Sequence, residues 1–344
     1  MRIIQVCKKT LGKFRISKKR IIAKIFKGGE IMIRIYNTNM ETEKIEEVKE
    51  IKKGVWINLV NPSDAEIKRV CTEINIEEDF IRYPLDYEEQ ARIDVEDNMT
   101  LFVIDVPIIE DIQDDTSYTT MPLGVIIVGD DYFITVSLKR NKVIDAFEKN
   151  RIKSFYTYKK TRFLLQILYL NSACYLENLK KINKEQEATV YLLQQSMKNR
   201  DLIQLLNLQN SLIYITTSLK SNEIVMEKTL RGKILKMYEE DEDILEDAII
   251  ENRQAIEMSK TYSDILTSTM DAYSSIISNN LNGVMKFLTS LTILISVPTL
   301  IASIWGMNVN VPFGNSPYGF AIMMGISVAV AIIAFIWLKR KDMI

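Results

Sequence analysis

The chain has 344 residues, with 44 basic and 45 acidic side chains, three cysteines and no histidine, so its formal net charge is −1. The absence of histidine excludes Ser-His-Asp and Cys-His catalytic pairs and imidazole zinc sites. Cys7, Cys71 and Cys174 form no CxxC pair, which is typical of idle or buried thiols in a reducing compartment. We therefore expect neither an enzyme nor a nucleic-acid-binding protein.

The near-neutral charge is the sum of two oppositely charged parts. Residues 1–31 carry ten basic side chains and one acid, a net of +9, and the rest of the chain carries −10. Lys and Arg alternate with Ile and Phe in this basic segment, as in segments that bind anionic lipid surfaces. Alternatively, KGGE at residues 27–30 can be encoded by a purine-rich ribosome-binding sequence, and Met32 is then the native start. We expect the second explanation, in which residues 1–31 are a translated leader.

Residues 32–150 predict a cytoplasmic α/β domain, because β-branched and aromatic segments alternate with helical patterns. Residues 64–74 predict a helix capped by Asn61 or Ser63, and Gly129-Asp130-Asp131 predicts a hairpin turn. The expected strands are 32–36, 55–60, 100–109, 121–128 and 132–138.

Long helices are predicted after the α/β domain. Residues 161–230 contain no glycine or proline and have leucines at helical spacing, so residues 151–238 predict a helical hairpin with a break near Asn199. Residues 239–305 predict one helix of some 65 residues, roughly 100 Å long at 1.5 Å per residue. Such a helix has to pack against the preceding helices or against copies of itself.

The C-terminal end predicts two membrane-spanning helices. No charge occurs between Lys286 and Lys339, and this stretch contains two apolar blocks of 19 residues, 287–305 and 320–338. Basic residues flank both blocks on one side, Lys286 before the first and the 339–344 tail after the second. Because positive flanks stay inside, we expect a multi-pass protein of the plasma membrane with cytoplasmic termini and residues 306–319 outside.

Polar residues follow one face of the long helix as it enters the membrane, with spacings of three and four. Two interpretations are open: tight helix–helix packing through small hydroxyl residues, or the lining of a pore around which several copies gather. Leu288 and Met285 lie at the cytoplasmic end, where apolar rings can gate a pore by dewetting. The stripe consists of Asn282, Met285, Thr289, Thr292, Ser296, Thr299 and Ser303.

The tripeptide Gly306-Met307-Asn308 ends the first membrane segment, directly after PTLIASIW. With the short loop, the second apolar block and the basic tail, it resembles the signature of the CorA family of magnesium channels and transporters. The resemblance covers residues 32–344. It implies a funnel-shaped pentamer in which Gly306, Met307 and Asn308 form the selectivity filter. Neutral amide oxygens suit a hydrated Mg²⁺, which gives up its waters reluctantly.

The sequence departs from the family pattern in three places. The loop lacks the acid that many relatives carry, Ser296 stands where well-known relatives have a bulky apolar pore residue, and Pro298 is displaced by one position. The hydrophobic gate therefore depends on Leu288 and Met285.

The resemblance also implies that cytoplasmic Mg²⁺, held between neighbouring subunits, closes the channel. Asp247 and Asp271 match the stalk acids of the family, but the place of the partner acidic pair is Arg82-Tyr83 here. The alternative for residues 239–247 is a solvated helix face. The nearby substitutes are Asp79, Asp86, Glu88 and Glu89.

We therefore expect a homo-oligomeric channel for uptake of hydrated Mg²⁺, driven by the membrane potential and regulated by cytoplasmic Mg²⁺. A Co²⁺, Ni²⁺ or Zn²⁺ transporter of the same family is the first alternative. A membrane-anchored structural or sensor protein with a coiled-coil stalk is the second, but it leaves the polar stripe without a purpose.

Overall fold

A computed structural model describes residues 32–96, 98–112, 115–195, 199–232, 234–307 and 318–341. The predicted leader, residues 1–31, lies outside them. The chain divides into two compact units, one that ends at Leu266 and one that begins at Thr267.

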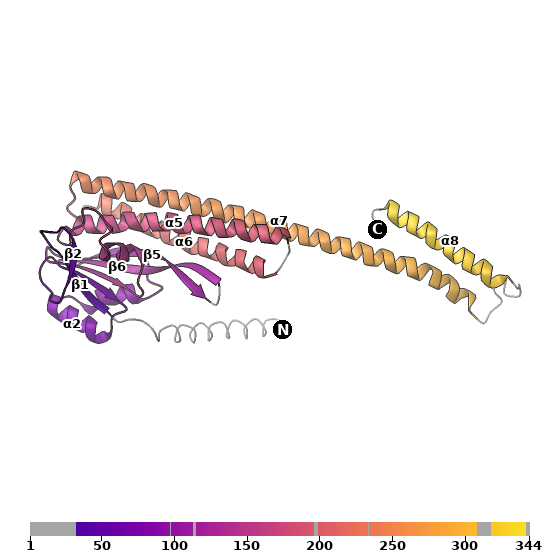
Figure 1. Ribbon diagram of the computed structural model, residues 1–344, viewed down its shortest axis with the longest axis horizontal. Coiled ribbons are helices and arrows are strands. Elements are labelled where there is room, and N and C mark those ends of the chain that lie inside the picture. The colour runs from indigo at the N-terminus through magenta and orange to yellow at the C-terminus, as the bar shows by residue number, and fades with distance from the viewer. Residues whose placement is uncertain are drawn as a thin grey trace. The chain divides into compact units, whose positions relative to one another are not determined.

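The first unit is built on a seven-stranded sheet with the strand order β2-β1-β3-β7-β6-β5-β4 (Figure 1). Only β3 and β7 pair in parallel among these strands. The strands are β1 (Met32–Thr38), β2 (Ile45–Val48), β3 (Trp56–Val60), β4 (Arg92–Glu96), β5 (Met99–Ile112), β6 (Asp115–Val128) and β7 (Tyr132–Ser137).

The five predicted strands are confirmed, and the two edge strands were missed. The sequences of β2 and β4, IEEV and RIDVE, are short and charged. Natural sheets use such edge strands to prevent pairing with other chains. For this reason they lack the apolar run by which a strand is recognised in a sequence.

Helices α2 (Asp64–Ile74) and α3 (Glu78–Arg82) occupy one face of the sheet, whereas α4 (Lys142–Glu148) packs into the core on the opposite face. Ser63 caps α2 through a reciprocal capping box with Glu66, which decides between the two predicted caps. Two short elements follow it, α3 and the 3₁₀ turn η1 (Tyr83–Leu85). The predicted hairpin turn at 129–131 joins β6 to β7, and α4 follows β7.

The sheet has a hydrophobic core on each face, because its side chains alternate along every strand. On β5, Leu101 and Val103 belong to the core beneath α2 and α3. Phe102 belongs to the opposite core, with Trp56 of β3 and Phe163 of α5. The sheet is thus a middle layer, with α2 on one face and the long helices on the other (Figure 1).

Three long helices make up the other layer: α5 (Lys160–Gln195), α6 (Asn199–Arg231) and α7 (Glu239–Trp305). The predicted break near Asn199 and the predicted third helix are confirmed. The sheet and the helices as far as Leu266 form one compact unit.

Buried polar bonds join α7 to α6. Asn252 Nδ2 donates to the Leu219 carbonyl over 2.9 Å, and Ser259 Oγ donates to the Leu212 carbonyl over 3.3 Å. Because buried polar groups satisfy one another only in one alignment, these bonds fix how α7 lies along α6.

Asp105 marks the point where β5 loses its edge partner, since β4 pairs only with Met99–Val103. The Asp105 backbone N–H donates to Asn222 Oδ1 over 2.8 Å, and its carbonyl accepts from Asn171, Asn222 and Tyr175. Side chains of α5 and α6 therefore replace the missing strand. This satisfies backbone groups that are costly to leave unpaired.

The same arrangement places the Asp105 carboxyl against the helices, and burial raises its pKa from 3.8 to about 6, opposed by a hydrogen bond from Ser218. The folded state therefore binds this proton more tightly than the unfolded state. The contribution of Asp105 to stability is lost as the pH rises from about 4 to about 6.

We predict that Asp105→Asn stabilises the protein above pH 7, by up to about 3 kcal/mol, because the buried charge is removed. The gain should shrink toward zero near pH 4. Urea unfolding of the full chain at pH 5, 6 and 8 measures this, with the exposed Asp130→Asn as control. An equal gain at every pH would contradict the assignment.

Candidate ion pathway

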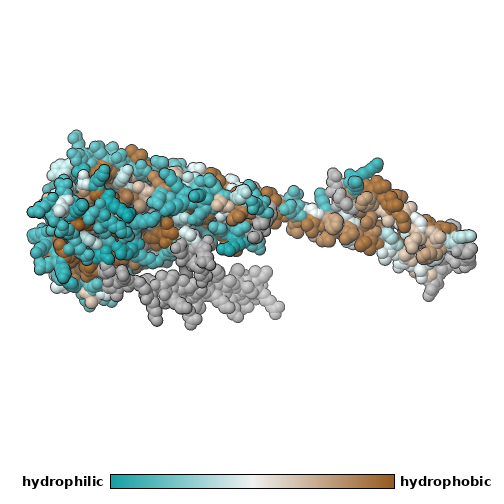
Figure 2. Space-filling model, viewed as in Figure 1, coloured by the Kyte–Doolittle hydropathy of each residue, from teal (hydrophilic) through white to brown (hydrophobic). Residues whose placement is uncertain are grey.

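Two described helices are long and apolar enough to cross a membrane, the C-terminal part of α7 and α8 (Gly319–Arg340). Few residues of either span are fully buried within the chain, and Figure 2 shows hydrophobic residues over this unit. They contain the predicted blocks 287–305 and 320–338. A soluble helix exposing this much apolar surface would be an aggregation hazard, whereas lipid covers it in a bilayer.

One face of each helix is covered within the second unit, where α8 lies beside α7 (Figure 1). Ser290 and Leu338 are fully buried. On α8, the half-buried residues include the small residues Ser327, Ala331 and Ala334. The covered α7 residues are Ser290, Ile293, Leu294, Val297, Pro298, Ile301 and Trp305.

The polar stripe of α7 lies on the other side of the helix. At about 100° per residue, its centre is roughly opposite the covered face. All of its members are exposed: Asn282, Met285, Thr289, Thr292, Ser296, Thr299 and Ser303. Packing against α8 therefore does not explain the stripe, and the two remaining occupants of this face are another copy of the chain and water.

Backbone bonds hold two hydroxyls of the stripe. Thr292 Oγ1 donates to the Leu288 carbonyl over 2.8 Å, and Thr299 Oγ1 donates to the Ile295 carbonyl over 2.7 Å. A hydroxyl that donates within its own helix keeps its lone pairs as acceptors. The face thus offers uncharged oxygens, which suit the water shell of a cation.

Apolar side chains border the stripe at its cytoplasmic end. Met285 is 54% exposed and Leu288 is 50% exposed, so both residues predicted to form a gate are uncovered within the chain. A ring of such side chains, one from each copy of the chain, can exclude water from a pore.

The helix ends at the predicted filter. The Gly306 N–H donates to the Ala302 carbonyl over 3.0 Å and the Met307 N–H to the Ile304 carbonyl over 3.3 Å. This change from four-residue to three-residue spacing is a usual helix ending. Gly306 and Met307 are exposed. Asn308 lies outside the described residues, and its place in the filter stays a prediction.

The structure does not gather the predicted cytoplasmic acids in one chain. Asp247 and Asp271 are exposed on α7, and Asp79, Asp86 and Glu88 are exposed around α3 and η1. Among the described residues, no three His, Cys, Asp or Glu side chains lie together as a metal site would require. Two of the substitutes already have local partners: Asp86 Oδ1 accepts from the Glu88 N–H over 3.0 Å, and Glu89 pairs with Arg92.

Arg82 and Tyr83, which stand where relatives carry an acidic pair, both have partners within the chain. The Arg82 guanidinium forms ion pairs of 2.9 Å with both Asp64 and Glu78. The Arg92 guanidinium lies 4.8 Å from the centre of the Tyr83 ring. The position at which relatives have two acids is therefore occupied by a cation and an aromatic ring, each with a partner of its own.

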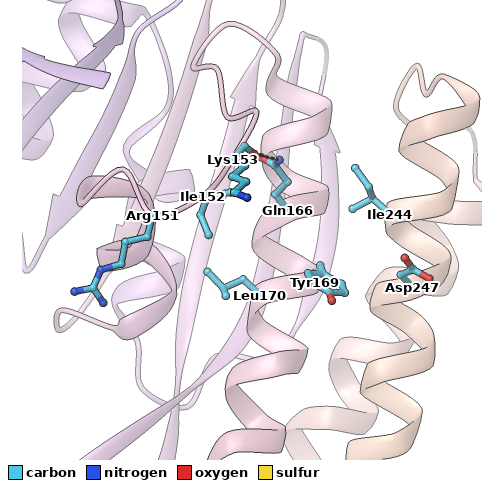
Figure 3. A pocket seen from close by; sticks show the side chains of 8 residues that line it. All are labelled: Arg151, Ile152, Lys153, Gln166, Tyr169, Leu170, Ile244 and Asp247. Atoms are coloured by element: carbon cyan, nitrogen blue, oxygen red, sulfur yellow. Dashed lines mark hydrogen bonds between the residues drawn. The ribbon is translucent and has the colours of Figure 1, made fainter. Parts of the chain in front are cut away.

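The sequence interpretation missed a cavity of about 320 Å³ beside Asp247, between α5, α7 and the segment after α4 (Figure 3). The signal available in the sequence was residues 149–162, which contain six basic side chains and no acid. The lining residues are Arg151, Ile152, Lys153, Gln166, Tyr169, Leu170, Ile244 and Asp247.

A family model described as CorA-like Mg²⁺ transporter protein matches residues 52–340, which include the sheet, the long helices and both apolar helices. The chain belongs to this CorA-like family. The family is one of transporters, so the chain is a membrane transporter and not an enzyme.

Named relatives agree with the family. A cobalt/magnesium transport protein CorA of Methanocaldococcus jannaschii is 28% identical over 87% of this chain and 94% of its own length. A protein of the same name from Thermotoga maritima is 28% identical over 37% of this chain and 39% of its own length.

Two solved structures have the same fold as this chain. The complete CorA magnesium transporter from Methanocaldococcus jannaschii superposes with a TM-score of 0.79 and 25% identity, over 92% of this chain and all of that one. The full-length CmaX protein covers 91% of this chain and 99% of its own, with a TM-score of 0.69 and 15% identity, and shows the fold alone. The predicted order of α/β domain, long helices and two C-terminal membrane helices is thus the CorA architecture.

We predict that the exposed stripe is reached by water in the assembled protein. A cationic thiol reagent should block most of the ion uptake of Ser296→Cys, because the new thiol lies on the uncovered face. Leu294→Cys, on the covered face, and the wild-type chain should be unaffected. Uptake into proteoliposomes measures this, and equal inhibition of both variants would contradict the placement of the stripe.

Proposed function

We propose that the chain assembles as a homopentamer in the plasma membrane and conducts hydrated Mg²⁺ inward through a pore lined by α7. The observation that carries the proposal is the polar stripe on the side of α7 that α8 does not cover. In a bilayer such groups face protein or water, not lipid. Copies of α7 around an axis satisfy this requirement.

The chemistry of the stripe suits a hydrated ion. Its hydroxyl and amide oxygens carry no fixed charge, and charge is absent from residues 287–338. A carboxylate ring would hold Mg²⁺ too tightly for release, whereas neutral oxygens can bind its water shell and let it go. Asn308 of each copy is proposed to do this at the outer mouth, next to Gly306 and Met307.

The membrane potential is a sufficient driving force. A divalent cation moving inward across 100 mV gains roughly 4–5 kcal/mol. The proposed orientation has both termini in the cytoplasm, because Lys286 and the basic residues after Leu338 flank the two spans on the same side. Uptake then needs no separate energy source.

Co²⁺ is the second candidate substrate. The names of the Methanocaldococcus jannaschii and Thermotoga maritima relatives include both cobalt and magnesium. A pore that binds the water shell has no need of His or Cys ligands for Co²⁺, and the chain has no His.

Cytoplasmic regulation is proposed to use the two exposed stalk acids, Asp247 and Asp271. Their partners would be Asp79, Asp86, Glu88 or Glu89 of the neighbouring subunit. One carboxylate from each of two subunits, completed by waters, is an ordinary Mg²⁺ environment. The exposure of Asp247 and Asp271 supports the proposal, because a shared site requires side chains that their own chain leaves uncovered.

We predict that Asn308→Ala lowers Mg²⁺ uptake into proteoliposomes about tenfold or more. Each amide contact with the hydrated ion is worth about 1 kcal/mol, and the substitution removes one such contact from every subunit around the pore. Asn310→Ala is the matched control in the same loop. Mg²⁺, Co²⁺, Ni²⁺ and Zn²⁺ are measured in parallel. Equal uptake by wild type and Asn308→Ala would remove the role assigned to Asn308.

We also predict that Asp247→Ala keeps the channel open at internal Mg²⁺ concentrations that close the wild type, since it removes a ligand for the regulatory ion. Current is recorded against internal Mg²⁺, with the adjacent exposed acid changed in Glu246→Ala as control. If the concentration dependence of Asp247→Ala matches that of the wild type, Asp247 has no part in sensing.

A further inference from the structure

The cavity beside Asp247 has the composition of a ligand site. Its volume of about 320 Å³ is at the lower end of the range for small-molecule sites, about 300–1,000 Å³. Apolar walls from Ile152, Leu170 and Ile244 surround a small number of polar groups. All lining residues belong to the first unit of one chain.

Charges of opposite sign line the cavity without neutralising each other. Lys153 comes from the segment between α4 and α5, and Asp247 comes from α7 (Figure 3). In the described part of the chain no ion pair joins them, and both side chains are exposed. A ligand that fits both walls therefore has to offer an anion to Lys153 and a cation or a hydrogen-bond donor to Asp247.

Gln166 adds an unused acceptor. Its Nε2 donates to the Lys153 carbonyl over 3.4 Å, which orients the amide. Its Oε1 is buried and has no hydrogen-bond partner, an arrangement that is costly unless a ligand or water donates to it. The ligand that completes the site therefore carries an N–H or O–H group.

The surroundings attract anions. Residues 149–162 contain six basic side chains and no acid. Lys149 pairs with Asp145 and Arg162 with Glu240, whereas Arg151 and Lys153 line the cavity. Basic side chains at a concave surface raise the local concentration of anionic ligands.

Tyr169 supplies a flat surface. It is 41% exposed on α5, at the same level as Asp247 on α7 (Figure 3). An aromatic ring next to cationic side chains is a common platform for stacking a base.

We infer that this cavity binds a mononucleotide as its magnesium complex. The phosphates lie against Lys153, the base lies on Tyr169, and a base or ribose donor meets Gln166 Oε1. The Mg²⁺ bridges the phosphates to Asp247. One carboxylate is few for a Mg²⁺ held by protein alone, but one or two carboxylates together with phosphates are the usual set.

The inference has a consequence for regulation, and it rests on the proposed role of Asp247 as a magnesium ligand. Asp247 and Ile244 belong to the helix that continues into the membrane segment. A ligand that contacts Lys153, Gln166 and Asp247 joins α7 to α5 and to the segment before it. Binding of nucleotide and Mg²⁺ therefore changes the contacts of the helix that also carries the polar stripe.

Equilibrium binding to the full-length protein in detergent tests the inference, with ADP and ATP as probes, each with Mg²⁺ and with a chelator. We expect saturable binding that is at least tenfold tighter with Mg²⁺. Lys153→Gln should weaken both forms at least tenfold, and Asp247→Asn should abolish only the gain from Mg²⁺. Lys159→Gln, a basic residue of the same segment that does not line the cavity, is the control and should bind as wild type.

Three results would overturn the inference: no binding at millimolar nucleotide, equal binding by Lys153→Gln and wild type, or magnesium pyrophosphate binding as tightly as the nucleotides. The last would show that the base makes no contact. Because binding is measured without ion flux, these failures are distinct from a failure of the proposed transport. If Asp247→Ala alters gating but the wild type binds no nucleotide, the nucleotide site is wrong and the proposed regulatory role of Asp247 stands.

Discussion

The structure depends most on one constraint, namely that polar groups in a hydrocarbon environment need a partner other than lipid. The second half of α7 carries a line of hydroxyl and amide groups through an otherwise apolar segment, and α8 covers the opposite face. A single chain therefore leaves its most polar membrane surface uncovered. The oligomer is a requirement of this surface, since only further copies and the water between them can satisfy it.

Helix α7 contributes residues to both units. It has 67 residues, begins in the first unit and ends just before the tripeptide that we propose as the filter. Within the first unit, Asn252 and Ser259 fix its alignment on α6 through buried bonds to backbone carbonyls. Any ligand that changes the contacts of α7 near Asp247 therefore acts on the element that carries the polar stripe.

The sheet is joined to the long helices at Asp105. Asp105 lies just past the end of β4, and Asn171, Tyr175 and Asn222 bind its backbone N–H and carbonyl in place of a neighbouring strand. Two of the long helices, α5 and α6, are thereby attached through one residue to β5, the strand next to the edge strand β4. The raised pKa of the Asp105 carboxyl is the cost of placing an acid at this junction, because burial disfavours the charged form.

Local patterns were sufficient for much of the fold. Unbroken helical periodicity determined α7 from Glu239 to Trp305, and the capping signal determined the start of α2. The edge strands β2 and β4 could not be predicted, because an edge strand is held by its neighbour and its own charges weaken the strand signal. The tripeptide at 306–308 indicated the family, since its meaning comes from its position at the end of a membrane segment.

The sequence by itself thus determined the two membrane segments, their flanking charges, the polar stripe and the family, because these depend on composition and spacing along the chain. Only the tertiary structure decided which side of α7 is covered, that Arg82 and Tyr83 have partners of their own, and that Lys153, Gln166 and Asp247 line one cavity. These facts depend on which distant segments meet. Periodicity shows that a helix has two faces, but the packed neighbour decides which of them is left for another copy, for water or for a ligand.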